Sequence, residues 1–467
     1  MANNWRNAPN KFRKRDSASK TRAQSAEKKL PRNAPDIDCV ITHLGARGDG
    51  IAEAEMVLDY QPQTVRLFVP DSLPHETLKV KPISRTSDGV RADIIELITQ
   101  SPDRKEPSCD VFPACGGCQF QHMASDAYRG WKEGALSEVL ERGGISPTQR
   151  RPTIWTGPGS RRRVTLSFRR TADTFILGFL GRASQFIQPA SSCTIMLPEL
   201  SKVALLLQGW GLHLPAGSNG QCQLNLLDSG VDILVLPQEK LAHDVLSTLA
   251  HETAMIGCQR LSVLQPGDDD PYLIYAGGEV VVRWGSLTLS PPSGAFLQST
   301  LIGEAALQDA VADCVKEARS IADIFCGSGT LSAPLLNKGK TVLAADNASS
   351  VTHFQQAANK AGYGHEVTFV RRNLFDAPLR ADELAGIDCA IIDPPRAGAS
   401  AQIAEIVKAR LPVIAMISCN PHSFCRDAQQ LLAAGYLCDW LQMIDQFHLT
   451  PHTELVARFS HDAGTAA

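Results

Sequence analysis

Two residues in the C-terminal part of the chain have side chains suited to covalent catalysis. Cys419 follows an apolar run, 413–417, and Glu454 precedes another, 455–459. A thiolate can form a covalent intermediate with a substrate, and a carboxylate can accept a proton from it. A cysteine at the end of a predicted strand is poorly explained by packing, whereas Glu454 alone could be a solvated charge at a strand edge.

The loop 323–330 is the candidate cofactor site. Its sequence, Asp-Ile-Phe-Cys-Gly-Ser-Gly-Thr, joins a predicted strand to a predicted helix. Glycines let the backbone approach a ligand closely, and Asp346, at the end of the next predicted strand, could accept hydrogen bonds from a ribose. The loop lacks the third glycine of G-x-G-x-x-G. It therefore disfavours a nicotinamide dinucleotide and leaves S-adenosylmethionine or a plain tight turn.

Three of the 13 cysteines, Cys109, Cys115 and Cys118, fall within ten residues. The sequence shows no apolar segment typical of a secretion signal, so we expect a cytoplasmic protein in which clustered cysteines bind a metal or act in catalysis. Isolated cysteines such as Cys222 and Cys258 are expected to be buried packing residues.

The charge of the chain is unevenly distributed. Residues 1–33 hold ten Lys or Arg and two acidic residues, a net charge of +8, although the whole chain carries −3. Because this segment has few large apolar side chains, it predicts a disordered basic arm that contacts phosphates or is only a solvated leader. No stretch approaches the 18 apolar residues of a membrane span.

Apolar runs alternate with helical segments after residue 297, a pattern typical of an α/β, Rossmann-like doubly wound sheet. The runs are 321–325, 342–345, 367–370, 387–392 and 413–417. Ligands of such sheets bind beyond the carboxyl ends of the strands. We therefore expect the loop 323–330, Asp393 and Cys419 to meet around one crevice.

Two further domains are predicted before this catalytic domain of residues 291–467. Alternating runs in 34–98 indicate four or five strands that form an OB-like β-barrel, which could bind nucleic acid or serve as a structural adaptor. Residues 99–290 combine the clustered cysteines, a helix near 128–141 and several strands. They predict a central α+β domain.

The motifs resemble, in their order, those of the RNA uracil-5-methyltransferases. The matching segments are Phe296-x-Gln298, 323–330, Asp393-Pro-Pro-Arg396, Ser418-Cys-Asn-Pro421 and Thr450-x-His452-x-Glu454. The barrel resembles a TRAM domain. The pattern Cys109-x5-Cys115-Gly-Gly-Cys118 with a distant Cys193 is similar to the 23S ribosomal RNA branch, rather than to the transfer-RNA branch.

The resemblance implies S-adenosylmethionine-dependent methylation of uracil C5 in ribosomal RNA. We expect the protein to be a monomer. In this chemistry Cys419 adds to C6 of uracil, which makes C5 nucleophilic, and Glu454 removes the C5 proton after methyl transfer. The cofactor-binding residues are then Gln298, Asp323, Phe325, Gly327, Gly329, Asp346 and Asp393. Four thiolates, Cys109, Cys115, Cys118 and Cys193, could hold zinc or an iron–sulfur cluster; spacing does not choose between them, and the resemblance implies a [4Fe-4S] cluster.

A uridine inside folded RNA must be turned out of its stack, so basic surfaces should grip the flanking strand. The candidates are the arm, Arg161–Arg163, Arg169 and Arg170, each of which could equally be a solvated charge. Three positions depart from the family pattern: Thr300 stands where Asn is frequent, Asp346 where Glu is usual, and His448 where Pro is usual.

Four other functions compete with this interpretation. Adenine-N6 methylation is disfavoured because Arg396, not an aromatic residue, follows the two prolines. Cytosine-5 methylation is disfavoured because Ser418, not Pro or Thr, precedes Cys419. Methylation of transfer RNA and a non-catalytic iron–sulfur RNA-binding protein remain open.

Overall fold

The computed structural model describes residues 28–31, 33–58, 60–182, 184–336, 338–347 and 350–461. Within these ranges the chain forms two compact units. The first unit contains the chain up to Ser108 together with Cys118–Lys132 and Leu449–Pro451. The second contains Cys109–Gly117, Glu133–His448 and the chain from His452 onward.

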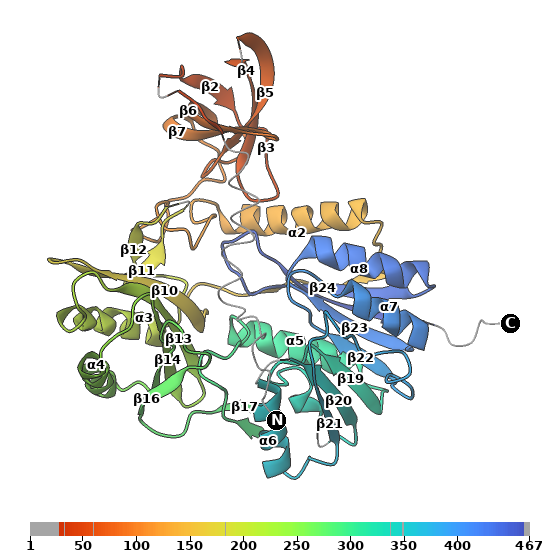
Figure 1. Ribbon diagram of the computed structural model, residues 1–467. Helices are drawn as coiled ribbons and strands as arrows, with labels where there is room; N and C mark the ends of the chain where they lie inside the picture. The colour runs from red at the N-terminus through yellow and green to blue at the C-terminus, as the bar shows by residue number, and fades with distance from the viewer. Residues whose placement is uncertain are drawn as a thin grey trace. The chain divides into compact units, whose positions relative to one another are not determined.

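The first unit is built on a β-rich domain with one curled sheet (Figure 1). Its strands are β1 (Lys28–Lys29), β2 (Ile37–Val40), β3 (His43–Leu44), β4 (Gly50–Leu58), β5 (Gln61–Val69), β6 (Thr77–Thr86) and β7 (Gly89–Thr99). The order is β1-β6-β7-β5-β4-β3, and β2 also pairs with β6. Thr42, just after β2, donates its N–H to Ile51 O of β4 at 2.9 Å, which brings the two edges of the sheet together.

Alternation along the strands builds the core of this domain. Leu78 and Val80 of β6 point inward and are fully buried, with Leu67 of β5 and Val90 of β7. The five longer strands agree with the four or five expected. The boundary of the basic arm was wrong: Lys28–Lys29 pairs with Arg85 and Ser84 of β6, while residues 1–27 and 32 lie outside the described residues.

The second unit contains a mostly antiparallel seven-stranded sheet in the order β12-β11-β10-β13-β14-β15-β16. Its strands are β10 (Arg163–Arg170), β11 (Phe175–Leu180), β12 (Ile187–Pro189), β13 (Asn219–Leu227), β14 (Gly230–Pro237), β15 (Arg260–Val263) and β16 (Tyr272–Ala276). Helices α3 (Pro198–Leu206) and α4 (His243–Ile256) and the 3-10 turn η1 (Leu207–Leu212) contribute apolar side chains to its core. A hairpin, β17 (Val282–Trp284) and β18 (Leu287–Leu289), follows.

The same unit holds the predicted Rossmann-like sheet, with strand order β21-β20-β19-β22-β23-β25-β24-β8. Its strands are β19 (Ser320–Ile324), β20 (Thr341–Asp346), β21 (Val367–Arg371), β22 (Cys389–Ile392), β23 (Val413–Ser418), β24 (Leu437–Asp445) and β25 (Glu454–Ser460). The strands from β21 to β23 are parallel, and β25 is antiparallel to both β23 and β24. The order reverses between β19 and β22, which is where such sheets bind ligands.

The boundary expected at residue 290 does not describe this sheet completely. Two short strands from the predicted central domain, β8 (Gln149–Arg150) and β9 (Ile154–Trp155), pair in parallel with β24. Neither has an apolar alternating run of its own. Their place depends on pairing with a strand almost 300 residues later, which local sequence does not reveal.

Helices cover both faces of the Rossmann-like sheet (Figure 1). Side chains on one face of the sheet, such as Ile392 and Met416, pack with α7 (Ser400–Ala409), with α8 (Pro421–Ala433) and with the later part of α2 (Ser125–Arg142). Side chains on the opposite face, such as Ile391 and Ile417, pack with α5 (Leu301–Cys314). Helix α6 (Ser350–Lys360) packs with β20, β21 and the β17–β18 hairpin. Strands apolar on both faces explain the continuous apolar runs in the sequence.

No helix among the described residues has both the length and the apolar character needed to cross a bilayer.

Candidate active site

The register of two neighbouring strands brings Cys419 and Glu454 to the same end of the sheet. Ser418, the last residue of β23, pairs with Leu455, the second residue of β25. Because the strands are antiparallel, Cys419 and Glu454 each lie one residue beyond that pair. The sequence had predicted both residues, and the structure places them together.

The backbone after Cys419 is held by a helix cap. Asn420 caps α8 by accepting a hydrogen bond from His422 N–H at 3.2 Å, and Pro421 occupies the first turn, where no N–H is needed. The Asn420 side-chain amide also donates to Arg396 O at 3.0 Å. The Asn420 cap therefore connects the loop of Cys419 to the loop that follows β22.

Burial and the neighbouring charged groups together set the pKa of the Cys419 thiol. Burial raises the pKa of Cys419 to about 11; the negative charges of Glu454 and Asp393 add to the rise, while Arg396 opposes it by its charge and by a hydrogen bond. Burial also raises the pKa of Glu454 well above its usual range, again with Asp393 adding and with Gln446 and Arg396 opposing. The free enzyme therefore holds a mostly protonated thiol beside a carboxyl group that exchanges its proton near neutral pH.

Glu454 is held by a chain of two side-chain amides. The Gln446 Nε2 group donates to Glu454 Oε2 and to Gln298 Oε1, both at 2.8 Å. Gln446 Oε1 accepts from Ser299 N–H at 3.0 Å. Glu454 is only 4% exposed, and Gln446 and Gln298 are also buried. The predicted cofactor residue Gln298 and the predicted base Glu454 therefore belong to one hydrogen-bonded network.

The glycine loop after β19 is tied to the end of β20. Asp346 accepts hydrogen bonds from Gly327 N–H at 3.0 Å and from Asn347 N–H at 2.6 Å. Phe325 has a left-handed backbone, with φ 66°, and its N–H donates to Ala345 O at 2.9 Å. Such a conformation is rare for a bulky residue and is frequent at binding sites.

Gly327 and Gly329 serve different purposes. At Gly329 an added Cβ would lie 2.5 Å from the Phe354 ring of α6, and its φ is 83°. An added Cβ at Gly327 would meet nothing within 4 Å. Gly329 is therefore required by the packing of the loop against α6, whereas the open side of Gly327 leaves space for a ligand.

The two other acidic residues predicted at the cofactor site have different surroundings. Asp323 is 1% exposed, and neither of its carboxylate oxygens has a hydrogen-bond partner; Ser332 is near enough to lower its pKa but outside hydrogen-bonding geometry. Burial raises the pKa of Asp323 to about 7; Ser332 opposes the rise, and the negative charges of Asp393 and Asp346 add to it. Asp393 follows β22, is half-buried, and donates its N–H to Ile324 O at 3.3 Å. Asp393 is thus partly exposed just beyond the end of β22, while Asp323 is enclosed near the end of β19.

The clustered cysteines were predicted to bind a metal. In the second unit, burial raises the pKa of Cys115, and the nearby thiols of Cys193 and Cys109 contribute to the rise. Cys118 belongs to the first unit and accepts a weak hydrogen bond from Gln121 at 3.7 Å. Within the described part of the chain, no three His, Cys, Asp or Glu side chains converge as a metal site would require. The described side chains therefore give no support to the predicted cluster.

One of the arginines expected to contact RNA is a structural residue. Arg162 is 2% exposed and forms an ion pair with Glu304, which also accepts from Trp284 Nε1 at 3.0 Å. The Arg162 Nε group donates to Gln298 O at 3.1 Å. The prediction that Arg162 contacts phosphates was therefore wrong. Residues distant in the sequence bury its guanidinium, and the local sequence does not distinguish it from a surface arginine.

The neighbouring Arg163 lies with its guanidinium 4.7 Å from the centroid of the Phe296 ring, and Phe296 is 62% exposed.

Sequence reasoning gave no role to Gln446, although it noticed the segment that contains it. Its neighbours Asp445 and Phe447 gave no local signal, and its bonds appear only when folding brings Gln298, Ser299 and Glu454 beside it. Of the positions that depart from the family pattern, Thr300 caps α5 by accepting from Gly303 N–H at 3.0 Å. His448 lies 3.9 Å from an oxygen of Asp445.

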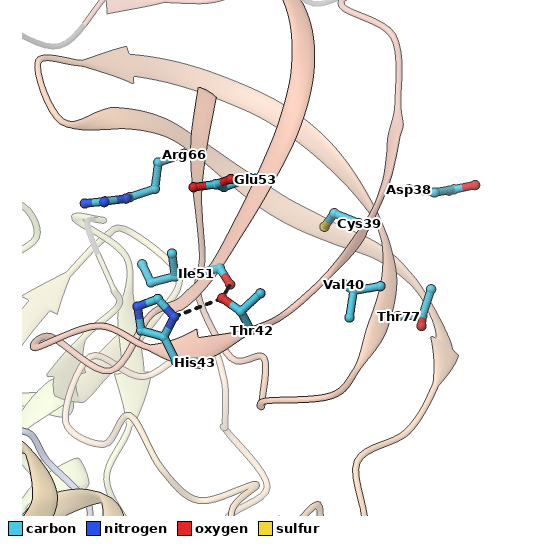
Figure 2. A pocket seen from close by; sticks show the side chains of 9 residues that line it. All are labelled: Asp38, Cys39, Val40, Thr42, His43, Ile51, Glu53, Arg66 and Thr77. Carbon is cyan, nitrogen blue, oxygen red and sulfur yellow. Dashed lines mark hydrogen bonds between the residues drawn. The ribbon is translucent and has the colours of Figure 1, made fainter. Parts of the chain in front are cut away.

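A separate pocket of about 620 Å³ lies in the β-rich domain (Figure 2). Its lining residues are Asp38, Cys39, Val40, Thr42, His43, Ile51, Glu53, Arg66 and Thr77. None of them belongs to the predicted catalytic or cofactor site.

Comparison with known proteins identifies the family. The family model described as tRNA (uracil-5-)-methyltransferase matches residues 290–459. An uncharacterised RNA methyltransferase of Mesorhizobium japonicum is 33% identical over 89% of this chain and 96% of its own length. The 23S rRNA (uracil(1939)-C(5))-methyltransferase RlmD of a Shewanella species is 31% identical over 92% of this chain and 95% of its own.

A solved structure supports the fold. The tRNA (uracil-54, C5)-methyltransferase of Pyrococcus abyssi, in complex with S-adenosyl-L-homocysteine, is similar with a TM-score of 0.66 and 22% identity, over 90% of this chain and 99% of that one. The architecture, the relatives and the family model agree. The chain belongs to the RNA uracil-5-methyltransferase family.

Proposed function

We propose that this protein methylates C5 of uridine in 23S ribosomal RNA, with S-adenosylmethionine as methyl donor and a covalent Cys419 adduct as intermediate. The observation that carries the proposal is the pairing of Ser418 with Leu455, because it sets a thiol and a buried carboxyl group at adjoining strand ends. The relative named as a 23S rRNA enzyme, similar over nearly the whole chain, supports the choice of substrate.

The reaction begins when Cys419 loses its proton to solvent and the thiolate attacks C6 of the uracil ring, which displaces the C5–C6 π pair. The electron pair moves to C5, which becomes nucleophilic enough to take the methyl group from the sulfonium of the cofactor. The proton left on C5 is then removed by Glu454, which re-forms the C5–C6 double bond and expels the thiolate. Burial keeps the pKa of the free Cys419 thiol at about 11, so Arg396 is the group that favours its ionisation.

The methyl donor is assigned to the crevice at the switch between β19 and β22. The open side of Gly327, the left-handed Phe325 and the carboxylate of Asp346 form its rim, with Asp393 and Gln298 beside the reacting groups. S-adenosylmethionine supplies the methyl group; the protein residues orient it and exclude water.

The surrounding parts of the chain are assigned supporting roles. The β-rich domain is proposed to be a TRAM-like RNA-binding module, residues 99–290 a central domain, and the basic arm a phosphate contact. We expect a monomer that acts in the cytoplasm. The [4Fe-4S] cluster stays a prediction from the four cysteines, and iron analysis of anaerobically purified protein tests it.

The covalent mechanism is tested by trapping the adduct. Glu454→Gln should form the adduct and transfer methyl but fail to release product, so a protein–RNA species that resists denaturant and carries the cofactor's labelled methyl group should accumulate. Cys419→Ala should form none, and the double variant should behave like Cys419→Ala, because a step that never begins cannot stall later.

Substrate choice is tested in the same assay with unmodified 23S rRNA and unmodified transfer RNA. Methyl transfer to 23S rRNA alone is expected. Transfer to transfer RNA alone would overturn the substrate assignment, and normal turnover by Glu454→Gln would overturn the role of the carboxylate.

A further inference from the structure

The side-chain amide of Gln446 forms three hydrogen bonds within the site. One Nε2 hydrogen goes to Glu454 Oε2 and the other to Gln298 Oε1, each at 2.8 Å, and Oε1 accepts from Ser299 N–H at 3.0 Å. An amide nitrogen has two hydrogens and the oxygen accepts. Only one of the two amide orientations satisfies all three bonds. In the flipped orientation the amide nitrogen would face the N–H of Ser299, and the amide oxygen would face the carboxylate of Glu454.

The protein backbone makes room for this side chain. An added Cβ on Gly303, in the first turn of α5, would lie 2.8 Å from Thr300 Oγ1, 2.9 Å from Gln446 Cβ and 3.1 Å from Gln446 Oε1. A tight turn at the end of β24, in which Gln446 N–H donates to Ile444 O at 3.0 Å, fixes the backbone on the other side. Gln446 is 2% exposed, so water does not compete for its bonds.

We propose that Gln446 is a positioning residue for the proton-abstraction step, and that its bond to Glu454 Oε2 makes Oε1 the oxygen that receives the C5 proton. This inference rests on the proposed function. In that step the C5–H bond breaks and its proton goes to Glu454 Oε1. The bonding pair forms the C5–C6 double bond, the C6–Sγ bond breaks, and its electron pair returns to the Cys419 sulfur.

The bond from Gln446 has two consequences for catalysis. It holds the carboxylate in one orientation, and it favours the ionised form, which is the form that can act as a base. Loss of the bond should therefore slow product release and should move the acidic limb of the release rate to higher pH. Attack by Cys419 and methyl transfer precede this step and should be affected much less.

The test is Gln446→Met, which keeps the length of the side chain but removes the three hydrogen bonds. Product release should slow about 10- to 100-fold, the range expected for one hydrogen bond to a charged group. The labelled protein–RNA adduct should accumulate, and its decay should recover at higher pH. Gln442→Met is the matched control, because Gln442 lies on β24 four residues before Gln446, is half-buried, and donates to Pro152 O at 2.9 Å away from the site residues.

Gly303→Ala gives a second perturbation, because its added Cβ crowds both Gln446 and the Thr300 cap of α5 without deleting any polar group. It should also accumulate adduct, although to a smaller extent. Release at the wild-type rate in both variants, or an unshifted pH profile, would overturn the proposal. Equal loss of adduct formation, methyl transfer and release would also overturn it, by showing that Gln446 only supports the fold.

Glu454→Gln, run in parallel, separates this inference from the proposed function. If Glu454→Gln traps the adduct and Gln446→Met does not, only the role of Gln446 is wrong. If Glu454→Gln itself traps nothing, the covalent mechanism is wrong.

Discussion

Arg396 should control the rate at which the Cys419 adduct forms. Burial raises the pKa of Cys419 to about 11, Glu454 and Asp393 add to the rise, and Arg396 is the cation that opposes it. At pH 8 a thiol with this pKa is ionised in about one molecule in a thousand. Any further rise in the pKa therefore reduces the nucleophile in direct proportion.

The size of the effect follows from the exposure of Arg396. A neighbouring opposite charge shifts a pKa by about 1–3 units, and solvent screening of an exposed guanidinium favours the lower end. Arg396→Met should therefore raise the pKa of Cys419 by about one unit, which lowers the thiolate fraction and the rate of adduct formation about tenfold at fixed pH. Arg396→Lys keeps the charge and should lose less.

The assay measures adduct formation alone. In a Glu454→Gln background product release is blocked, so the appearance of denaturant-resistant protein–RNA species reports the attack of the thiolate. The rate should rise with pH between about 7 and 10 in both proteins, with the Arg396→Met profile displaced by about one pH unit to the alkaline side. Arg380→Met is the control, because the side chain of Arg380 is 67% exposed and pairs with Asp382 and Glu383 rather than with site residues.

Two results would refute this reasoning. An unchanged rate would show that Arg396 does not stabilise the thiolate. A loss that higher pH does not restore would show that Arg396 acts by another route, such as holding the loop through the contact of its guanidinium with His452 Nδ1 at 3.3 Å.

Two further predictions concern the cysteines and the arm. Cys115→Ser should lower the iron content of anaerobically purified protein from about four atoms per chain and should lower the thermal stability of the central domain, with Cys419 still reactive toward a thiol reagent; wild-type protein with stoichiometric zinc and no iron would contradict this prediction. Deleting residues 1–27, which hold seven Lys or Arg and two acidic residues and leave β1 intact, should weaken RNA binding and flatten its dependence on salt, with turnover at saturating RNA little changed. An unaltered salt slope would show that the arm does not contact phosphates.

Much of the catalytic fold could be predicted from local sequence because its signals are local. The five apolar runs after residue 297 match β19 to β23 within a few residues, since strands covered by helices on both faces must be apolar throughout. The glycine loop and the position of Cys419 could be predicted for the same reason: each directly follows such a run. Strand β24 and the short strands β8 and β9 lacked a comparable local signal and were missed.

The sequence by itself determined which residues are available for chemistry: a thiol after one strand, a carboxylate before another, and a glycine loop between strand and helix. Only the tertiary structure decided the burial, the pKa and the hydrogen bonds of those residues. Burial beside other acidic groups raises the pKa of Cys419 and of Glu454. Folding also buries Arg162 in an ion pair and hydrogen-bonds Gln446 to a residue about 150 positions away in the chain. Desolvation and hydrogen bonding depend on neighbours that are distant in the chain, so they arise only when strand register and packing bring those neighbours together.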